Sequence, residues 1–234
     1  MNMRKILCTI LLIMAYSVTY AQVISKQEIE EYAHLGNMSW TGKAEELSHQ
    51  DSLNNNGEMV LSVIKEYKGQ SKSELYKKIF NWILSISSSD KSALLVSDET
   101  LGQIQARCYI PDIAKRSTGD NSYIVSIRPL LKFDFKEEKT RFTFILQSFD
   151  VLNKSEEAGY VMMFGGGFGF TATGVSKDNQ VWQLKDCYPF AEKRKHPKVT
   201  SSRAFVNSVS IYNILVDRIN EVLQKPLPVE NESW

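Results

Sequence analysis

Alternating apolar and polar residues define the middle of this chain most clearly between Tyr123 and Val151. Within that span only residues 136–139, Lys-Glu-Glu-Lys, resemble a turn, so the pattern predicts a β-hairpin in which Phe133 faces Phe142 and Asp134 faces Arg141. A slip of one residue would separate the apolar side chains, so this register is strongly specified. The apolar face of the hairpin then comprises Leu131, Phe133, Phe135, Phe142, Phe144 and Leu146.

The chain before this hairpin predicts helices and further strands. Two capping-box sequences, residues 25–28 and 71–74, each begin a helix, and the second helix has a wide apolar face that requires a sheet to cover. The alternation in residues 101–110 predicts a half-buried antiparallel strand. The remaining expected strands are Met59–Tyr67 and Ala93–Val96, and the expected polar loops are residues 36–57 and 112–122.

After Leu152 the pattern weakens, then becomes clear again in a C-terminal helix. Residues 165–169 are rich in glycine, and Val181–Tyr188 predicts a short strand. Apolar residues then recur at steps of three and four from Arg203 to Leu223, which predicts a helix capped by one of Thr200, Ser201 or Ser202. The order of elements predicts an α+β protein with a curved antiparallel sheet, helices on one face and an N-terminal helical extension.

The first residues have the pattern of a secretory signal peptide. Arg4 and Lys5 precede an apolar stretch from Ile6 to Ser17, and Thr19-Tyr20-Ala21 supplies small residues at the cleavage positions before Gln22. We expect an exported protein of the periplasm or cell envelope of a Gram-negative bacterium, soluble after cleavage. Lipid attachment at Cys8 is the less favoured alternative.

The composition excludes several classes of partner. Hydrophobic content of 43% and charged content of 24% are ordinary for a globular protein, and a net charge of +1 gives no electrostatic basis for binding nucleic acid. No apolar run after Gln22 approaches the roughly 18 residues of a membrane-spanning helix. We therefore expect neither a nucleic-acid partner nor a membrane span in the mature chain.

Two cysteines remain after signal cleavage, Cys108 and Cys187. A disulfide between them fits an oxidising compartment, whereas two unpaired thiols, with Cys108 on the buried face of its strand, are the simpler interpretation. The sequence leaves both interpretations open.

The span from Met59 to about Leu152 resembles the bacterial domain of unknown function with a TBP-like fold, found in exported proteins. The residues that carry the resemblance are Ser73-Glu74-Leu75-Tyr76, Asn81-Trp82-Ile83, Asp98, Gly102-Gln103-Ile104 and the charged turn from Lys136 to Arg141. The resemblance implies a curved antiparallel sheet with helices on one face, and it implies no activity.

The expected organisation has five parts. They are a signal peptide (1–21), an N-terminal helix and loop extension (22–57), a TBP-like core (58–152), a glycine-rich segment with the C-terminal helix (153–225) and a tail (226–234).

No catalytic constellation, metal-ligand spacing or cofactor motif is recognisable, so we expect no catalytic residues, metal or cofactor. Two segments are candidate binding sites, although a loop or bulged strand explains the first more simply and a solvated loop explains the second more simply. The first is Gly165, Gly166, Gly167 and Phe168, where the backbone can approach a ligand closely; the second is the basic cluster Lys193, Arg194 and Lys195 before the last helix, which suits a phosphate or sulfate.

These observations favour a non-enzymatic envelope protein that binds another protein or a glycan through its sheet face or its glycine-rich segment. The first alternative is an envelope hydrolase that uses carboxylates or Cys187. The second is a purely structural accessory domain of an envelope assembly.

Overall fold

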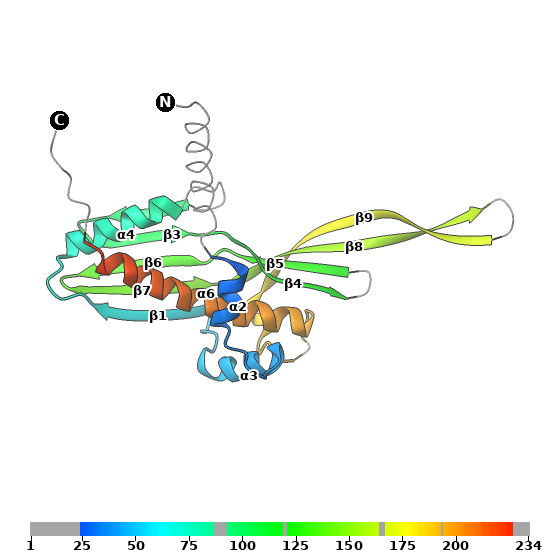
Figure 1. The fold of residues 1–234 in the computed structure, drawn as a ribbon, viewed down its shortest axis with the longest axis horizontal. Helices are drawn as coiled ribbons and strands as arrows, with labels where there is room; N and C mark the ends of the chain where they lie inside the picture. Colours follow the sequence, from blue (N-terminus) through cyan, green and yellow to red (C-terminus); the bar gives the residue numbers. More distant parts are fainter. Residues whose placement is uncertain (1–23, 87–92, 119–120, 164–166, 193, 227–234) are drawn as a thin grey trace, which may run out of the picture.

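The computed structural model describes residues 24–86, 93–118, 121–163, 167–192 and 194–226, with the backbone alone for residues 118 and 156–175. Two antiparallel sheets and a layer of helices make up the described chain (Figure 1). The five-stranded sheet has the order β1-β7-β6-β3-β2, with strands β1 Met59–Glu66, β2 Ala93–Asp98, β3 Gln103–Arg107, β6 Leu130–Lys136 and β7 Lys139–Leu146. The four-stranded sheet has the order β4-β5-β8-β9, with strands β4 Ile110–Thr118, β5 Asn121–Ile127, β8 Ser148–Met163 and β9 Gly167–Gln183.

The two sheets are joined as one bent layer. Strand β3 continues into β4 after two residues, β5 into β6 after two residues, and β7 into β8 after Gln147 alone. These three connections lie side by side, because β3, β6 and β7 are neighbours in one sheet and β4, β5 and β8 are neighbours in the other. The layer therefore bends along one line across all three strands, at Cys108-Tyr109, Arg128-Pro129 and Gln147.

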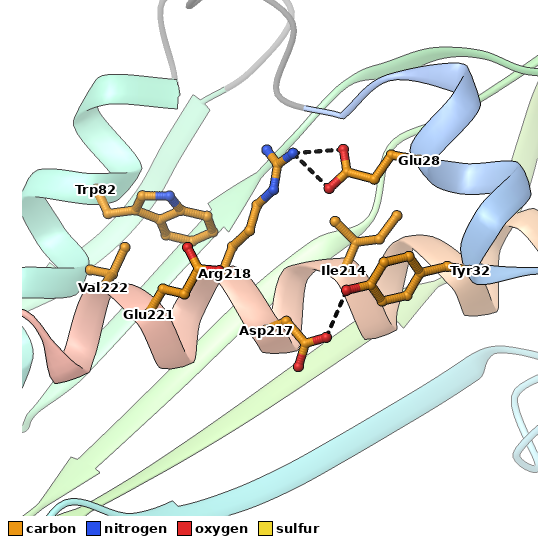
Figure 2. Close-up of a pocket in the computed structure, with 8 residues that line it drawn as sticks. All are labelled: Glu28, Tyr32, Trp82, Ile214, Asp217, Arg218, Glu221 and Val222. Carbon is orange, nitrogen blue, oxygen red and sulfur yellow. Dashed lines mark hydrogen bonds and ion pairs between the residues drawn. The ribbon is translucent and has the colours of Figure 1, made fainter.

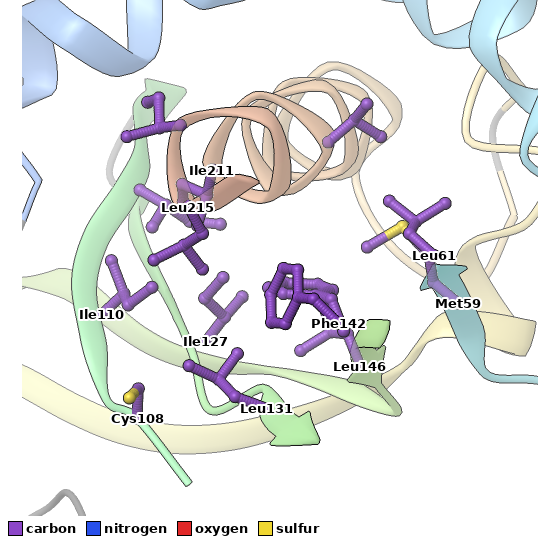
Figure 3. Packing of buried hydrophobic residues seen from close by; sticks show 14 of the residues in the cluster. Met59, Leu61, Cys108, Ile110, Ile127, Leu131, Phe142, Leu146, Ile211 and Leu215 are labelled. Carbon is purple, nitrogen blue, oxygen red and sulfur yellow. The ribbon is translucent and has the colours of Figure 1, made fainter. Parts of the chain in front are cut away.

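Helices cover one face of this layer. The main ones are α4 (Lys72–Ile86) and α6 (Lys198–Gln224), while the short α5 (Leu184–Cys187) follows β9. The ring of Tyr212 in α6 is stacked on Phe142 of the five-stranded sheet, and Asn207 in the same helix donates a hydrogen bond to the Ile113 carbonyl of the four-stranded sheet. Helix α6 thus crosses the bend and is bound to both sheets. Figure 3 shows Ile211 and Leu215 of α6 above the apolar residues of the strands.

The N-terminal helices α2 (Lys26–Tyr32) and α3 (Trp40–Gln50) pack against α6. Helix α2 begins with the predicted capping box, since the Ser25 hydroxyl accepts from the Glu28 amide and the Glu28 carboxylate accepts from the Ser25 amide. Arg218 of α6 binds the Glu28 carboxylate at 2.7 Å, and Arg203 binds Glu30 at 2.6 Å. The N-terminal extension is therefore held to α6 by ion pairs as well as by its few apolar residues.

The predicted hairpin register is confirmed. Phe133 pairs with Phe142 and Asp134 with Arg141, and the two phenylalanines are 0% and 2% exposed. Their ring centroids lie 5.1 Å apart, and the Asp134 carboxylate accepts from Arg141 Nε at 3.0 Å on the opposite face. The α+β class, the curved antiparallel sheet and the helices on one face are confirmed with it.

The β6–β7 turn also holds the start of α4. The Glu138 carboxylate accepts the Gly69 amide at 2.7 Å, and the Glu137 carboxylate accepts the Lys72 amide at 3.2 Å. Nearby, Gly102 has a φ of +66°, and a Cβ there would come within 2.9 Å of the Phe135 carbonyl oxygen and against the Lys72 side chain. Only glycine fits this position without displacement of its neighbours.

Several sequence predictions were wrong in detail. Residues 36–57 are not all loop, because α3 lies there, and of the predicted loop 112–122, residues 112–118 belong to β4 and residues 121–122 to β5. The alternation from Tyr123 to Val151 is one hairpin, β6–β7, flanked by two strands of the other sheet. The last helix begins at Lys198, with Ser201 and Ser202 inside it, and the predicted strand Val181–Tyr188 is the end of β9 followed by α5.

Candidate functional sites

Strands β8 and β9 extend well beyond the rest of the molecule (Figure 1). They pair from Ser148–Gln183 to Met163–Gly167, with a register shift between Glu157 and Ala158, whereas β5 pairs with β8 only from Phe149 to Ser155. We call residues 156–163 and 167–175 the arm. In the described chain, the arm strands pair only with each other, so both outer edges of the ribbon lack a strand partner.

The arm differs in chemistry from the surface around it. Between Glu157 and Lys177 the sequence has no charged residue. The register pairs Tyr160 with Phe170 and Met162 with Phe168, and paired residues occupy the same face of a ribbon. One face therefore carries large apolar residues; the other carries the alternate positions, Gly159, Val161, Met163, Gly167, Gly169 and Thr171.

The base of the arm is anchored in the core. Trp182 of β9 is 1% exposed; its ring lies 5.6 Å from the Tyr123 ring and is stacked on His196 at 4.4 Å. Burial lowers the pKa of His196, which favours the neutral form of the imidazole that is stacked on Trp182. The outer part of the ribbon is thus a continuation of strands that are fixed at their inner ends.

A pocket of about 430 Å³ lies between α2, α4 and α6 (Figure 2). Its wall has apolar and aromatic parts, including the Trp82 ring, whose centroid is 6.4 Å from that of the core residue Phe133. Its polar groups are largely bound to one another. The eight lining residues are Glu28, Tyr32, Trp82, Ile214, Asp217, Arg218, Glu221 and Val222.

The hydrogen bonds inside this pocket have a structural role. Arg218 Nη2 donates to both oxygens of Glu28, at 2.8 and 2.7 Å, and the Tyr32 hydroxyl donates to Asp217 at 2.8 Å. The bond to Asp217 raises the pKa of Tyr32. Both contacts join α2 to α6, so these groups hold the N-terminal helix, and the arrangement offers no nucleophile beside a base.

The uncovered face of the five-stranded sheet has mixed charge. The Asp134 carboxylate lies 2.9 Å from Arg141 and 3.7 Å from Lys132, so one acid partly neutralises two bases. Ile64, which is 64% exposed, adds an apolar position on β1. Nothing in this face concentrates the positive charge that a nucleic-acid backbone requires.

The predicted glycine-rich site coincides in part with the arm. Gly165 and Gly166 lie outside the described residues, while Gly167 and Phe168 begin β9 opposite Met163 and Met162. The sequence left a loop and a bulged strand open for this segment, and its described part is strand.

The predicted basic cluster lies in the connection before α6. Lys193 is outside the described residues, Arg194 binds Glu192 at 2.9 Å, and Lys195 binds Asp186 at 3.1 Å. Each described cation of this cluster therefore has a carboxylate partner, which reduces its attraction for a phosphate or sulfate.

Both cysteines are free and buried, at 8% exposure for Cys108 and 2% for Cys187. Burial raises the pKa of Cys108 to about 11; burial and the charge of Asp186 raise that of Cys187 to about 12. A nucleophilic cysteine needs the opposite shift, toward the thiolate. The geometry of Cys187 therefore does not suit a catalytic thiol.

Within the described residues there is no group of three or more His, Cys, Asp or Glu side chains arranged to hold a metal ion. The same part of the chain has no helix with the length and apolar character needed to cross a membrane.

Comparison with known proteins identifies similar folds. The chain is similar to a TBP-like protein from Parabacteroides distasonis, with a TM-score of 0.48, 12% sequence identity and coverage of 75% of this chain and 97% of the other. It is also similar to a DUF4468 family protein from Bacteroides ovatus, with a TM-score of 0.43, 13% identity and coverage of 76% and 96%. No family model and no curated protein matches the chain.

One of these two proteins is described as TBP-like, which is the fold that the sequence resemblance implies. Their descriptions state no ligand or activity.

Sequence reasoning found the glycine-rich segment but missed the arm that contains it. The signal was present, since the uncharged run between Glu157 and Lys177 and the alternation of Tyr160 and Met162 are visible in the sequence. The α2–α6 pocket had no comparable signal, because Glu28 and Arg218 are 190 positions apart.

Proposed function

We propose that this protein is an exported cell-envelope protein that acts as a non-enzymatic binding module, and that it binds a protein partner through the arm. The single observation that carries the proposal is the arm's combination of geometry and sequence. It is a two-stranded ribbon that extends away from the body, and it has no charged residue between Glu157 and Lys177.

A ribbon of this kind is marginal when solvent surrounds it. An isolated two-stranded hairpin is barely stable in water, and a third strand or a packed face is needed for it to be stable on its own. Uncharged, apolar edges are also those that other proteins recognise, whereas edges that avoid contact usually carry charge or proline. Binding of a partner protein would therefore stabilise the arm, and the chemistry of the arm would determine which proteins bind.

The chemistry of the arm favours a protein over a glycan. Glycan sites need several polar side chains to bind hydroxyl groups, and the sequence from Ala158 to Val175 supplies only Tyr160 and two threonines. The alternative of an envelope hydrolase receives no support from Cys187, whose thiol is buried and protonated at neutral pH. Nor does the Glu28–Asp217–Glu221 group support it, since two of its carboxylates bind α2 to α6.

Site-specific photo-crosslinking in cells tests this proposal. A photoreactive phenylalanine analogue replaces Phe170 in the arm, and in a matched strain it replaces Ser117, which is exposed near the end of β4. We expect a discrete crosslinked product from position 170 and none from position 117. Mass spectrometry identifies the partner, and purified partner must then bind the wild-type chain but not the Phe168→Ser/Phe170→Ser variant.

Two results would overturn the proposal. One is the absence of any arm-dependent crosslink from positions 160, 168 and 170. The other is cell fractionation that finds the chain in the cytosol with residues 1–21 retained. Turnover of an envelope polymer that is lost on one polar substitution would replace the binding function by an enzymatic one.

A further inference from the structure

We infer that a hollow beside α5 binds an acidic sugar, that is, a sugar residue that carries a carboxylate or a sulfate ester. The hollow has a volume of about 390 Å³ and lies between the loop before β1 and the segment that follows β9. This volume is in the range of small-molecule sites, which is about 300–1,000 Å³. The lining residues that carry the inference are Asn54, Asn55, Asn56, Lys185 and Tyr188. None of them belongs to the arm, so this site does not depend on the proposed function.

The first support is an exposed aromatic ring on a rigid base. Tyr188 is 36% exposed, and its ring meets that of Phe190 edge-on, with a centroid distance of 5.9 Å. Phe190 is fully buried and stacked on Phe205 of α6 at 4.1 Å. A tyrosine ring is apolar on its face and polar at its tip, so it suits a ligand of mixed character. A pyranose, with an apolar C–H face and hydroxyl groups around its edge, is such a ligand.

The second support is a loop whose shape is fixed by one side chain. Asn54 Oδ1 accepts the backbone amides of Asn56 and Glu58, both at 2.9 Å, and Asn54 Nδ2 donates to the Glu58 carboxylate. The side chains of Asn55 and Asn56 are exposed and have no hydrogen-bond partner in the described chain. A side-chain amide has both donors and an acceptor, which is the combination that neighbouring hydroxyl groups of a sugar require.

The third support is the charge of the hollow. Among the described residues that line it, Lys185 is the only charged one, and its ammonium group has no ion-pair partner in that part of the chain. Acids close to it in sequence or in the loop are already bound: the Glu58 carboxylate accepts from two side-chain amides, and Asp186 binds Lys195 at 3.1 Å. A charge-assisted hydrogen bond to an anionic group is stronger than one between neutral groups, so Lys185 favours an acidic sugar over a neutral one.

A peptide fits this hollow less well than a sugar. Peptides are recognised chiefly through a free strand edge, an apolar groove or a cluster of arginines. The described lining consists of a turn with three asparagines, one lysine of the four-residue helix α5 and the tyrosine that follows this helix, together with Leu53 and Gly57. It supplies none of these three features.

Isothermal titration calorimetry of the purified exported chain tests the inference with three ligands of similar length. They are tetragalacturonic acid, a sulfated galactotetraose and neutral galactotetraose. We expect saturable binding of at least one acidic ligand with a Kd below about 1 mM, and at least about 10-fold weaker binding of the neutral one. The two acidic ligands distinguish a carboxylate from a sulfate ester as the group that Lys185 binds. A rise in NaCl from about 0.05 M to about 0.5 M should weaken this binding several-fold, because salt screens exposed charges.

Four variants assign the binding to the hollow. Tyr188→Leu keeps an apolar side chain without the ring, and we expect it to weaken binding by about 10-fold or more. Lys185→Gln should remove the preference for the acidic ligand. Asn55→Ala/Asn56→Ala leaves the side chain of Asn54 in place and should also weaken binding. The matched control is Lys77→Gln, at an exposed position of α4 outside the lining, which should bind as the wild type does. Circular dichroism and thermal unfolding establish that each variant is folded.

Three results would overturn the inference. The first is the absence of saturable binding for all three ligands at millimolar concentration. The second is equal affinity of the wild type for acidic and neutral ligands. The third is binding that Lys185→Gln and Asn55→Ala/Asn56→Ala leave as strong as in Lys77→Gln. Crosslinking from position 170 of the arm is a separate measurement, so failure of the sugar site leaves the proposed function standing, and failure of the arm leaves the sugar site standing.

Discussion

Substitution of Phe142 measures how much the packing of helices on the sheet contributes to stability. Its ring is 2% exposed and lies between Phe133, at 5.1 Å, and Tyr212 of α6, at 5.8 Å. Phe142→Ala removes the ring from both contacts, and such truncation of a buried phenylalanine costs about 3–5 kcal/mol. Since a domain is stable by about 5–15 kcal/mol, the variant should remain folded with a much lower midpoint of urea unfolding.

A milder variant and a control make this prediction quantitative. Phe142→Leu keeps most of the apolar volume but loses the two ring contacts, so we expect a loss of about 1–2 kcal/mol. A double-mutant cycle with Phe133→Leu should give a coupling of about 0.5–1.5 kcal/mol between the rings. Ile64→Thr, at a 64% exposed position on the other face of the sheet, should change stability by less than about 0.5 kcal/mol.

A Phe142→Ala variant that is no less stable than Ile64→Thr, with the same slope of unfolding free energy against urea concentration, would contradict this packing. Such a result would mean that the face of the sheet opposite the helices is the buried one. The assignment of the arm's base to the core would then fail with it, because β7 continues directly into β8.

Three further predictions concern other parts of the fold. Gly102→Ala should destabilise the protein by about 1–3 kcal/mol in urea unfolding, because the new Cβ meets a backbone oxygen and the φ of +66° is strained for alanine. Ser25→Ala should cost about 1 kcal/mol and speed hydrogen exchange in α2, whose capping box it breaks. Since burial raises the pKa of Cys108 to about 11 and that of Cys187 to about 12 from 9.0, the unfolded chain loses these protons first. Stability should therefore be full below pH 9 and fall as the pH rises toward about 12, and Cys187→Ala should make this fall shallower.

Each of these predictions has a clear contrary result. Gly102→Ala with wild-type stability would mean that the turn adopts another conformation. Hydrogen exchange in α2 that Ser25→Ala leaves unchanged would mean that contacts with α6 alone hold the helix. Rapid modification of Cys187 by a thiol reagent in the folded protein would contradict its burial.

Sequence reasoning succeeded where one physical rule determined the structure. The register of Phe133 with Phe142 followed from the period of a strand, and the start of α2 followed from a Ser and a Glu three residues apart. Both signals lie within a few residues of chain, so no knowledge of the rest of the fold was required.

The errors occurred where the usual signal was weak or interrupted. Helix α3 was missed because its buried residues include the small Ala44 and Ser48, which give little apolar periodicity. Strand β4 was missed because a register shift between Ile110 and Ala114 breaks its alternation. The start of α6 was placed too late because Ser201 and Ser202 resemble caps, whereas their hydroxyls donate to the Lys198 carbonyl inside the helix.

Of the candidate sites, likewise, one has a local sequence signal and the other does not. The glycine-rich segment is local in sequence and was identified, with a loop and a bulged strand left open as its structure. The pocket between α2 and α6 joins residues from opposite ends of the chain, and only tertiary structure brings Glu28 to Arg218.

The bend in the layer also has a mechanical consequence. Because β7 passes into β8 through Gln147 alone, the backbone that forms the arm is continuous with β7, an interior strand of the five-stranded sheet. Helix α6 braces the angle between the two sheets through Tyr212 and Asn207. A force applied at the arm is therefore transmitted along this backbone to β7 and the five-stranded sheet.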